Sequence, residues 1–204
     1  NLIDFNEVFA YHREKGADMT LIYRKGVCEN DLRDHMDLSL NENGKVVDAQ
    51  LRSKVGNETN SCINVWVVNR RLLEEAIAQG YESFHRDLVF NNIKGLKIYG
   101  YEYKGVYLHV NSMENYFKYN MALLEKDTRN ALFGNKNHRV YTKVRDSAPT
   151  RYGEDAQVSD SFIADGCEIE GKVENSILFR GVKVGRGTVV KNSILMQDTI
   201  TGDN

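Results

Sequence analysis

A net charge of −2 over 204 residues leaves no surplus of positive charge for binding nucleic acid or an anionic membrane. The length suits one large domain or a domain and a half, and 41% hydrophobic with 27% charged residues is typical of a soluble globular protein. No apolar run approaches the roughly 18 residues of a transmembrane helix, so we expect a cytoplasmic protein without membrane contact.

The first elements are predicted from apolar spacing. Apolar residues at 5, 8 and 9, followed one turn later by position 12, predict an amphipathic helix over 5–15. Asp4 is placed to cap its start, and Gly16 to end it. The run 19–23 is rich in β-forming residues and predicts a strand directly after the helix.

A hairpin and further alternating elements follow. Strands over 37–40 and 45–48 flank the turn 41–44, whose Asn-Gly pair is a strong hairpin signal. Alternating helices and strands argue for a layered α/β domain. The remaining expected elements are strands over 62–68, 96–103 and 106–110, a helix over 70–79 capped by Asn69 and stopped by Gly80, and a helix over 112–124.

The C-terminal part has a different texture. Residues 127–147 are polar and basic without clear periodicity, and Pro149 is the only proline of the chain. A rigid extended turn that leads into a second domain is the simplest interpretation. We therefore predict one domain with its linker over 1–147 and a second over 148–204.

One phrase recurs three times in that second domain. It begins at Val158, Val173 and Val190, at offsets of 15 and 17 residues, and each copy carries Asp-Ser or Asn-Ser before two apolar residues. Aliphatic residues recur at intervals of six, with glycines between them. This pattern predicts a parallel β-helix of hexapeptide repeats, in which about 18 residues make one rung and stacked rungs share a core.

The three cysteines do not indicate a disulfide or zinc site. Cys28, Cys62 and Cys167 are odd in number, widely separated, and lack CxxC or His-rich spacing. Reduced intracellular thiols are the expectation. The first residue is Asn1 and no signal peptide precedes it, so the sequence is interpreted as part of a longer protein.

Several motifs together resemble one enzyme family. His12 with Lys15-Gly-Ala-Asp-Met-Thr20, the stretch 105–121, and Leu178-Phe-Arg-Gly-Val182 are similar to segments of ADP-glucose pyrophosphorylase (glucose-1-phosphate adenylyltransferase). The resemblance covers almost the whole chain. It implies the C-terminal half of an α/β nucleotidyltransferase domain followed by the start of a left-handed β-helix. The family makes ADP-glucose and pyrophosphate from ATP and glucose-1-phosphate, with Mg²⁺.

The sugar-phosphate pocket that this resemblance implies is degenerate in two places. Where the family has "F.EKP", Leu51 replaces the glutamate, Arg52 the lysine and Ser53 the proline. Leucine cannot accept hydrogen bonds from sugar hydroxyls. Arg52 could still meet a phosphate, although a solvated strand-end charge is the plainer interpretation.

A second pair of departures lies further along the chain. In the family strand "SMGIYVF", glycine lets the sugar approach the backbone, and Asn64 stands at that glycine with Trp66 at the tyrosine. Trp66 fits a core aromatic better than a sugar platform. The stretch "DFGKDIIP" is represented by 83–90, where Asp87 survives while His85 replaces the glycine and Phe90 the proline.

The family's metal-binding aspartate is also missing. His109 stands where "W.DVGT" has its carboxylate. Mg²⁺ prefers oxygen ligands and imidazole is a poor substitute, so no metal and no catalytic residue is assigned. A surface histidine at a strand end is the plain alternative for His109.

These departures resemble the regulatory, weakly or non-catalytic paralogue of bacterial glycogen synthesis (glycogen biosynthesis protein D). The resemblance implies a hetero-oligomer with a catalytic subunit, in which ATP and sugar phosphates are possible ligands and Mg²⁺ belongs to the active complex. An active sugar-phosphate nucleotidyltransferase is the alternative. A hexapeptide acyltransferase is remote, because all five histidines precede the first rung and none can serve as its base there.

Overall fold

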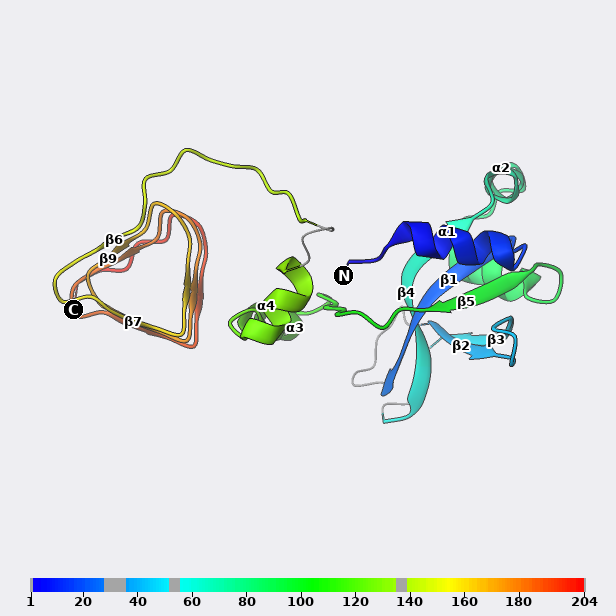
Figure 1. Ribbon diagram of the computed structural model, residues 1–204, viewed down its shortest axis with the longest axis horizontal. Coiled ribbons are helices and arrows are strands. Elements are labelled where there is room, and N and C mark those ends of the chain that lie inside the picture. The colour runs from blue at the N-terminus through cyan, green and yellow to red at the C-terminus, as the bar shows by residue number, and fades with distance from the viewer. Residues whose placement is uncertain (1, 28–35, 52–55, 135–138, 204) are drawn as a thin grey trace. The chain divides into compact units, whose positions relative to one another are not determined.

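The computed structural model describes residues 2–27, 36–51, 56–134 and 139–203, and it divides into two compact units. One unit spans Ile3–Gly105, and the other runs from Val106 to the C-terminal end (Figure 1). The predicted domain boundary near residue 148 stays a prediction. The first strand of the C-terminal repeats begins at Arg151.

A five-stranded mixed sheet organises the first unit, in the order β3-β2-β4-β1-β5. Strand β1 lies inside this sheet, because it pairs antiparallel with β4 on one edge and parallel with β5 on the other. Met19, Leu21 and Ile22 are accordingly fully buried. The strands are β1 (Met19–Val27), β2 (Met36–Leu40), β3 (Val46–Leu51), β4 (Glu58–Val68) and β5 (Ile98–Glu102).

The hairpin predicted over 37–48 is confirmed as the antiparallel pair β2–β3. The Asn41 side-chain oxygen accepts the backbone N–H groups of Asn43 and Lys45 at 3.0 and 2.9 Å, which closes the turn. Gly44 has φ +78°, and a Cβ there would lie 2.8 Å from the Tyr11 hydroxyl. Both the backbone conformation and the close approach therefore require glycine.

The first predicted helix is α1 (Phe5–Glu14), and the Asp4 carboxylate accepts the N–H of Asn6 as a cap. The second is α2 (Arg70–Ala78), but Asn69 does not cap it with its side chain. That side chain instead accepts from His12 and donates to the carbonyl of Ala17. The tertiary contact outweighs the local one.

Three features differ from the predictions. Residues 106–110 are not a strand, because the chain leaves the sheet after β5 and alternation alone does not supply a pairing partner. A helix, α4 (Lys126–Phe133), lies within the segment expected to lack structure, and Leu132 is its one buried side chain. The helix is only eight residues long and more of its residues are polar than apolar, so the sequence gives a weak helix signal. Finally, η1 (Phe84–Val89) and η2 (Phe90–Asn92) form a short helical segment, while α3 (Met113–Ala122) is present as expected.

The C-terminal repeats form the predicted parallel β-helix, whose triangular section is visible in Figure 1. Its three faces are the sheets β12-β9-β6, β13-β10-β7 and β14-β11-β8. Successive rungs pair at offsets of 15 or 17 residues, as in Val158–Val173–Val190. The strands are β6 (Arg151–Tyr152), β7 (Gln157–Ser159), β8 (Phe162–Ile163), β9 (Glu168–Ile169), β10 (Lys172–Glu174), β11 (Ile177–Leu178), β12 (Lys183–Val184), β13 (Val189–Lys191) and β14 (Ile194–Leu195).

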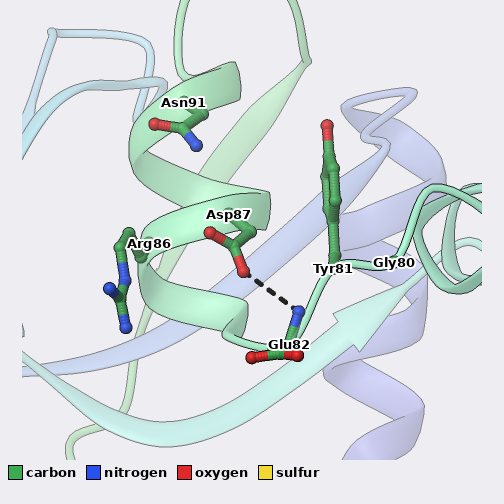
Figure 2. A pocket seen from close by; sticks show the side chains of 6 residues that line it. All are labelled: Gly80, Tyr81, Glu82, Arg86, Asp87 and Asn91. Carbon is green, nitrogen blue, oxygen red and sulfur yellow. Dashed lines mark hydrogen bonds between the residues drawn. The ribbon is translucent and has the colours of Figure 1, made fainter.

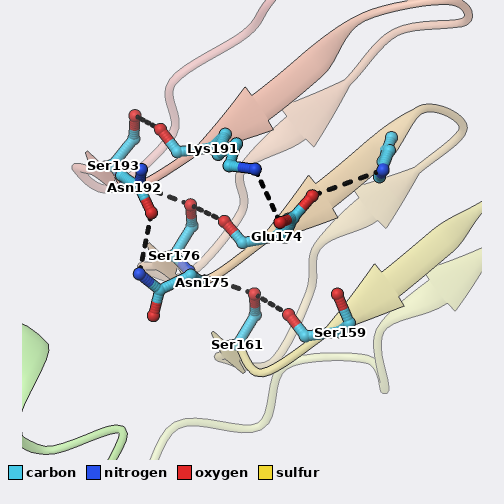
Figure 3. A network of polar contacts seen from close by, with 9 residues as sticks. Ser159, Ser161, Glu174, Asn175, Ser176, Lys191, Asn192 and Ser193 are labelled. Atoms are coloured by element: carbon cyan, nitrogen blue, oxygen red, sulfur yellow. Dashed lines mark hydrogen bonds and ion pairs between the residues drawn. The ribbon is translucent and has the colours of Figure 1, made fainter.

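A polar ladder runs along one corner of this β-helix (Figure 3). Asp160, Asn175 and Asn192 have φ of 45°, 45° and 48°, a region that Asn and Asp tolerate better than other side chains. The Asn175 amide donates to the Asn192 side-chain oxygen at 2.7 Å. Beside them, the Ser176 hydroxyl donates to the Glu174 carbonyl and accepts the backbone N–H of Ser193. The repeated Asp-Ser and Asn-Ser pairs therefore hold the rungs in register.

Candidate functional site

A groove of about 740 Å³ lies along β4 in the first unit. It is open to solvent and carries both apolar and polar groups. Strand β4, helix α2 and the segment that leads into η1 supply its lining, which consists of Asn64, Trp66, Val68, Leu73, Glu82, Ser83, Phe84 and His85. Aromatic faces next to amide, hydroxyl and carboxylate groups suit a small polar ligand with an apolar side.

Asn64 lies at an irregularity of β4. Leu21 of β1 pairs with Trp66 while Tyr23 pairs with Cys62, so three residues of β4 face one residue of β1. Asn64 is the middle one of the three and has φ +57°. The bulge turns its side chain outward, and its exposed amide can therefore reach η1. Asparagine is among the few residues that replace glycine at such a φ at modest cost.

His85 meets Asn64 across the groove. Its Nε2 lies 3.1 Å from the side-chain oxygen of Asn64, a distance at which the imidazole N–H donates. The imidazole also stands nearly perpendicular to Trp66, with ring centroids 5.1 Å apart. Two residues that replace family glycines thus touch each other, which the sequence did not reveal.

Trp66 is a partly buried aromatic that packs against the hydrophobic core and also lines the groove. Phe84 meets it edge to face at a centroid distance of 4.9 Å. Two edge contacts hold the indole ring in place. Below it, burial raises the pKa of the Cys62 thiol to about 11, partly offset by the backbone N–H of Asn64 and the Trp66 indole. Cys62 is therefore a neutral core residue at physiological pH.

Asp87 has a structural role in the neighbouring pocket of about 300 Å³ (Figure 2). Its carboxylate accepts the backbone N–H groups of Ser83 and Glu82 at 2.9 and 3.0 Å. These hydrogen bonds, that of Ser83 first, lower the pKa of Asp87. The Ser83 hydroxyl in turn accepts the N–H of Arg86. Asp87 therefore fixes the start of η1, which carries His85.

The other predicted site residues are distributed differently. Leu51 is the last residue of β3, with 47% of its surface exposed, and it pairs with Met36. Arg52 and Ser53 lie outside the described residues. His109 belongs to the second unit, where its ring stacks on Tyr107 at 5.8 Å with an interplanar angle of 23°. Among the predicted substrate-pocket residues that the structure describes, Asn64 and Trp66 line the same groove.

His12 and Thr20, which belong to one of the motifs that resemble the enzyme family, take part in a buried hydrogen-bond network. The His12 Nδ1 lies 2.8 Å from the Thr20 hydroxyl, and its Nε2 lies 3.2 Å from the Asn69 side-chain oxygen. Because Asn69 presents an acceptor, Nε2 donates and Nδ1 accepts from Thr20. Both residues are buried, so this motif ties α1 to β1 and to the start of α2.

Within the described ranges, no group of three His, Cys, Asp or Glu side chains could hold a metal ion. Cys62 and Cys167 are buried free thiols, and Cys28 lies outside those ranges. In the described part of the chain, no helix is both long and apolar enough to cross a membrane.

Comparison with known proteins confirms the resemblance inferred from the motifs. The family described as GlmU-like, C-terminal hexapeptide matches residues 145–204. The chain is 30% identical over 193 residues to the glycogen biosynthesis protein GlgD of Bacillus subtilis, which covers 93% of this chain and 46% of that protein.

Catalytic relatives are similar to nearly the same extent. The chain is 28% identical over 197 residues to the glucose-1-phosphate adenylyltransferase of Mycoplasma mobile, covering 93% of this chain and 51% of the relative. The enzyme of the same name from Clostridium botulinum is 27% identical over 203 residues, covering 94% and 51%. The chain spans about half the length of the curated relatives it matches.

Proposed function

We propose that this chain, a relative of glucose-1-phosphate adenylyltransferases and GlgD, is part of a regulatory subunit of glycogen biosynthesis. In this proposal its first unit is the C-terminal half of a nucleotidyltransferase domain with little or no catalytic activity, and its β-helix is left-handed. The subunit acts by assembling with a catalytic glucose-1-phosphate adenylyltransferase. The observation that carries the proposal is the groove along β4, where Asn64 and His85 bond to each other.

The residues at the remaining family positions support the same conclusion. Leu51 presents an exposed aliphatic side chain where the family pattern has a glutamate that grips the sugar. His109 supplies a ring stacked on Tyr107 where the pattern has a metal carboxylate. These residues do not fit Mg²⁺, which prefers carboxylate and water oxygens, so no catalytic step is assigned to a metal held by this chain.

Loss of catalysis is compatible with a retained fold. A subunit that contributes surfaces and ligand contacts can shift the conformational equilibrium of a catalytic partner without doing chemistry itself. The described chain keeps the elements needed for that role, because its sheet, its buried His12 network and its β-helix core are intact. The Mg²⁺ and ATP of the reaction would then be bound at the partner's site.

A second candidate is an active sugar-phosphate nucleotidyltransferase. The similarity of 28% and 27% to two glucose-1-phosphate adenylyltransferases favours it. The hexapeptide acyltransferase has no comparable support in the catalytic groups of the β-helix, since all five histidines precede its first strand.

The test is a rate measurement on the full-length protein. ADP-glucose formation from ATP and glucose-1-phosphate is followed for the protein alone, for the catalytic subunit of the same organism alone, and for their mixture. We expect negligible turnover alone and an altered kcat or KM in the mixture. Robust turnover by the protein alone would establish the second candidate instead.

A further inference from the structure

We infer that Asn64 and His85 form a latch over the β4 backbone, which keeps a sugar phosphate in the open groove from approaching that backbone. The inference deepens the proposed function and rests on it, because it names the residues of this chain that keep the substrate from the β4 backbone. Neither residue would be singled out by its own chemistry. Their mutual hydrogen bond makes them a pair.

The backbone under the latch is built for close approach. At the bulge of β4, Asn64 has φ +57°, a conformation that most side chains avoid and glycine adopts freely. A glycine there would leave the strand backbone open to a ligand. Asn64 instead places an exposed amide at this position. The bulge therefore keeps the geometry of an approach point while its own side chain covers it.

The second half of the latch comes from η1. His85 reaches back to the Asn64 side-chain oxygen at 3.1 Å and rests edge-on against Trp66. Its position is held by the Asp87 carboxylate, which fixes the start of η1 through the backbone N–H groups of Glu82 and Ser83. The imidazole is thus anchored on two sides. Each residue of the pair satisfies a polar group of the other.

The rest of the groove retains groups that suit a sugar. Trp66 and Phe84 offer aromatic surface, and Glu82 and Ser83 offer a carboxylate and a hydroxyl. Glucose-1-phosphate, the substrate named in the relatives' activity, is the matching probe. A sugar that enters over β4 must displace both side chains and break their hydrogen bond. In this inference, removing one side chain leaves the other beside the backbone, so both must be removed before a sugar can approach the bulge.

The experiment compares four forms of the full-length protein: wild type, Asn64→Gly, His85→Gly and the double variant. Binding of glucose-1-phosphate is measured by titration calorimetry, with circular dichroism as the check on folding. We expect the wild type and both single variants to bind weakly, and the double variant to bind at least about tenfold more tightly, a change of roughly 1.4 kcal/mol. Asn64→Gly suits its φ, so the backbone is not strained.

Arg86→Ala is the matched control, because Arg86 neighbours His85 but lines the other pocket. It should bind as the wild type does. A folded double variant that binds no better than the wild type would overturn the latch. So would a single variant that gains the full affinity. Neither result touches the regulatory role, which the rate of the mixture with the catalytic subunit tests separately.

Discussion

The two units of this chain are stabilised in different ways. In the β-helix, successive rungs repeat the same strand pairing, so Val158, Val173 and Val190 lie in register at offsets of 15 and 17 residues. In the α/β unit, the polar contacts that matter join distant positions, such as His12 with Asn69 and Asn64 with His85. Repetition makes a structure easy to infer, whereas a single long-range contact can alter function without disturbing the fold.

The largest effect on stability is expected from a substitution that creates a cavity in the core of the β-helix. Ile169 is fully buried and pairs with Tyr152 and Val184 in the adjacent rungs. Ile169→Ala should lower the free energy of unfolding by about 2–5 kcal/mol, measured by chemical denaturation. Val189→Ala is the control, since Val189 is 61% exposed, and it should change stability by no more than about 0.5 kcal/mol. Equal effects would contradict the shared core.

The long-range network of the α/β unit should be nearly as sensitive. His12→Ala leaves the hydroxyl of the fully buried Thr20 without its imidazole partner. It also removes the hydrogen bond from the imidazole to the side-chain oxygen of Asn69. We expect a loss of about 1–3 kcal/mol in the free energy of unfolding, measured in the same way. Glu14→Ala, on the exposed face of α1, should be close to neutral. A neutral His12→Ala would show that the motif does not hold the helix in place.

The serine ladder allows a comparison within the β-helix itself. Ser176 is fully buried, donates to the Glu174 carbonyl and accepts from the Ser193 backbone. Ser176→Ala should cost about 1–3 kcal/mol of unfolding free energy because the part-buried N–H of Ser193 loses its acceptor, whereas the Glu174 carbonyl keeps the N–H of Asn192. Ser193→Ala loses its bond to the Lys191 carbonyl at a more exposed position and should cost less. A larger loss of unfolding free energy for Ser193→Ala than for Ser176→Ala would contradict this account of the ladder.

The surface ion pairs should have the smallest effect on stability. The pH dependence of unfolding shows whether they stabilise or destabilise the fold. Hydrogen bonds from Lys183 and then Arg151 lower the pKa of Glu168, and those from Lys191 and then Lys172 lower that of Glu174. A carboxyl with a lowered folded pKa stabilises the fold above its ordinary value of 4.5, and this contribution is lost as pH falls through the folded pKa.

Thermal unfolding between pH 7 and pH 3 measures this contribution. The midpoint should fall on acidification, and the Glu168→Gln, Glu174→Gln double variant should show a shallower fall than the wild type. Both carboxylates are partly exposed to solvent, so the difference should be small and should shrink further in high salt. Identical pH profiles would mean that the four ion pairs of these two carboxylates do not contribute to stability.

Much of the fold could be predicted because its signals are local or repeated. The repeated phrase and the aliphatic residues at intervals of six predicted the β-helix. The structure explains the Asn-Ser part of the phrase by the left-handed backbone of Asn175 and the hydroxyl hydrogen bond of Ser176. The Asn-Gly turn predicted the β2–β3 hairpin. Helix α4 was missed because it is short and mostly polar, and Leu132 is its one buried side chain.

The site was less predictable. Resemblance singled out Asn64 and Trp66, which share one groove, but it placed Leu51 and His109 in the same functional group without showing any contact between them. His85 was visible only as a departure from a glycine pattern. Its bond to Asn64 joins β4 to η1, and no spacing along the chain encodes such a contact. A paired departure at two glycine positions is the signal that could have indicated it.

The account depends most on whether this protein performs chemistry within its complex. The decisive measurement is ADP-glucose synthesis by the full-length protein mixed with a catalytic subunit whose own active site has been inactivated by mutation. We predict no product above the background of either protein alone, although the two still assemble by size-exclusion chromatography. Sustained ADP-glucose formation in that mixture would contradict the account, because the active site would then belong to this chain.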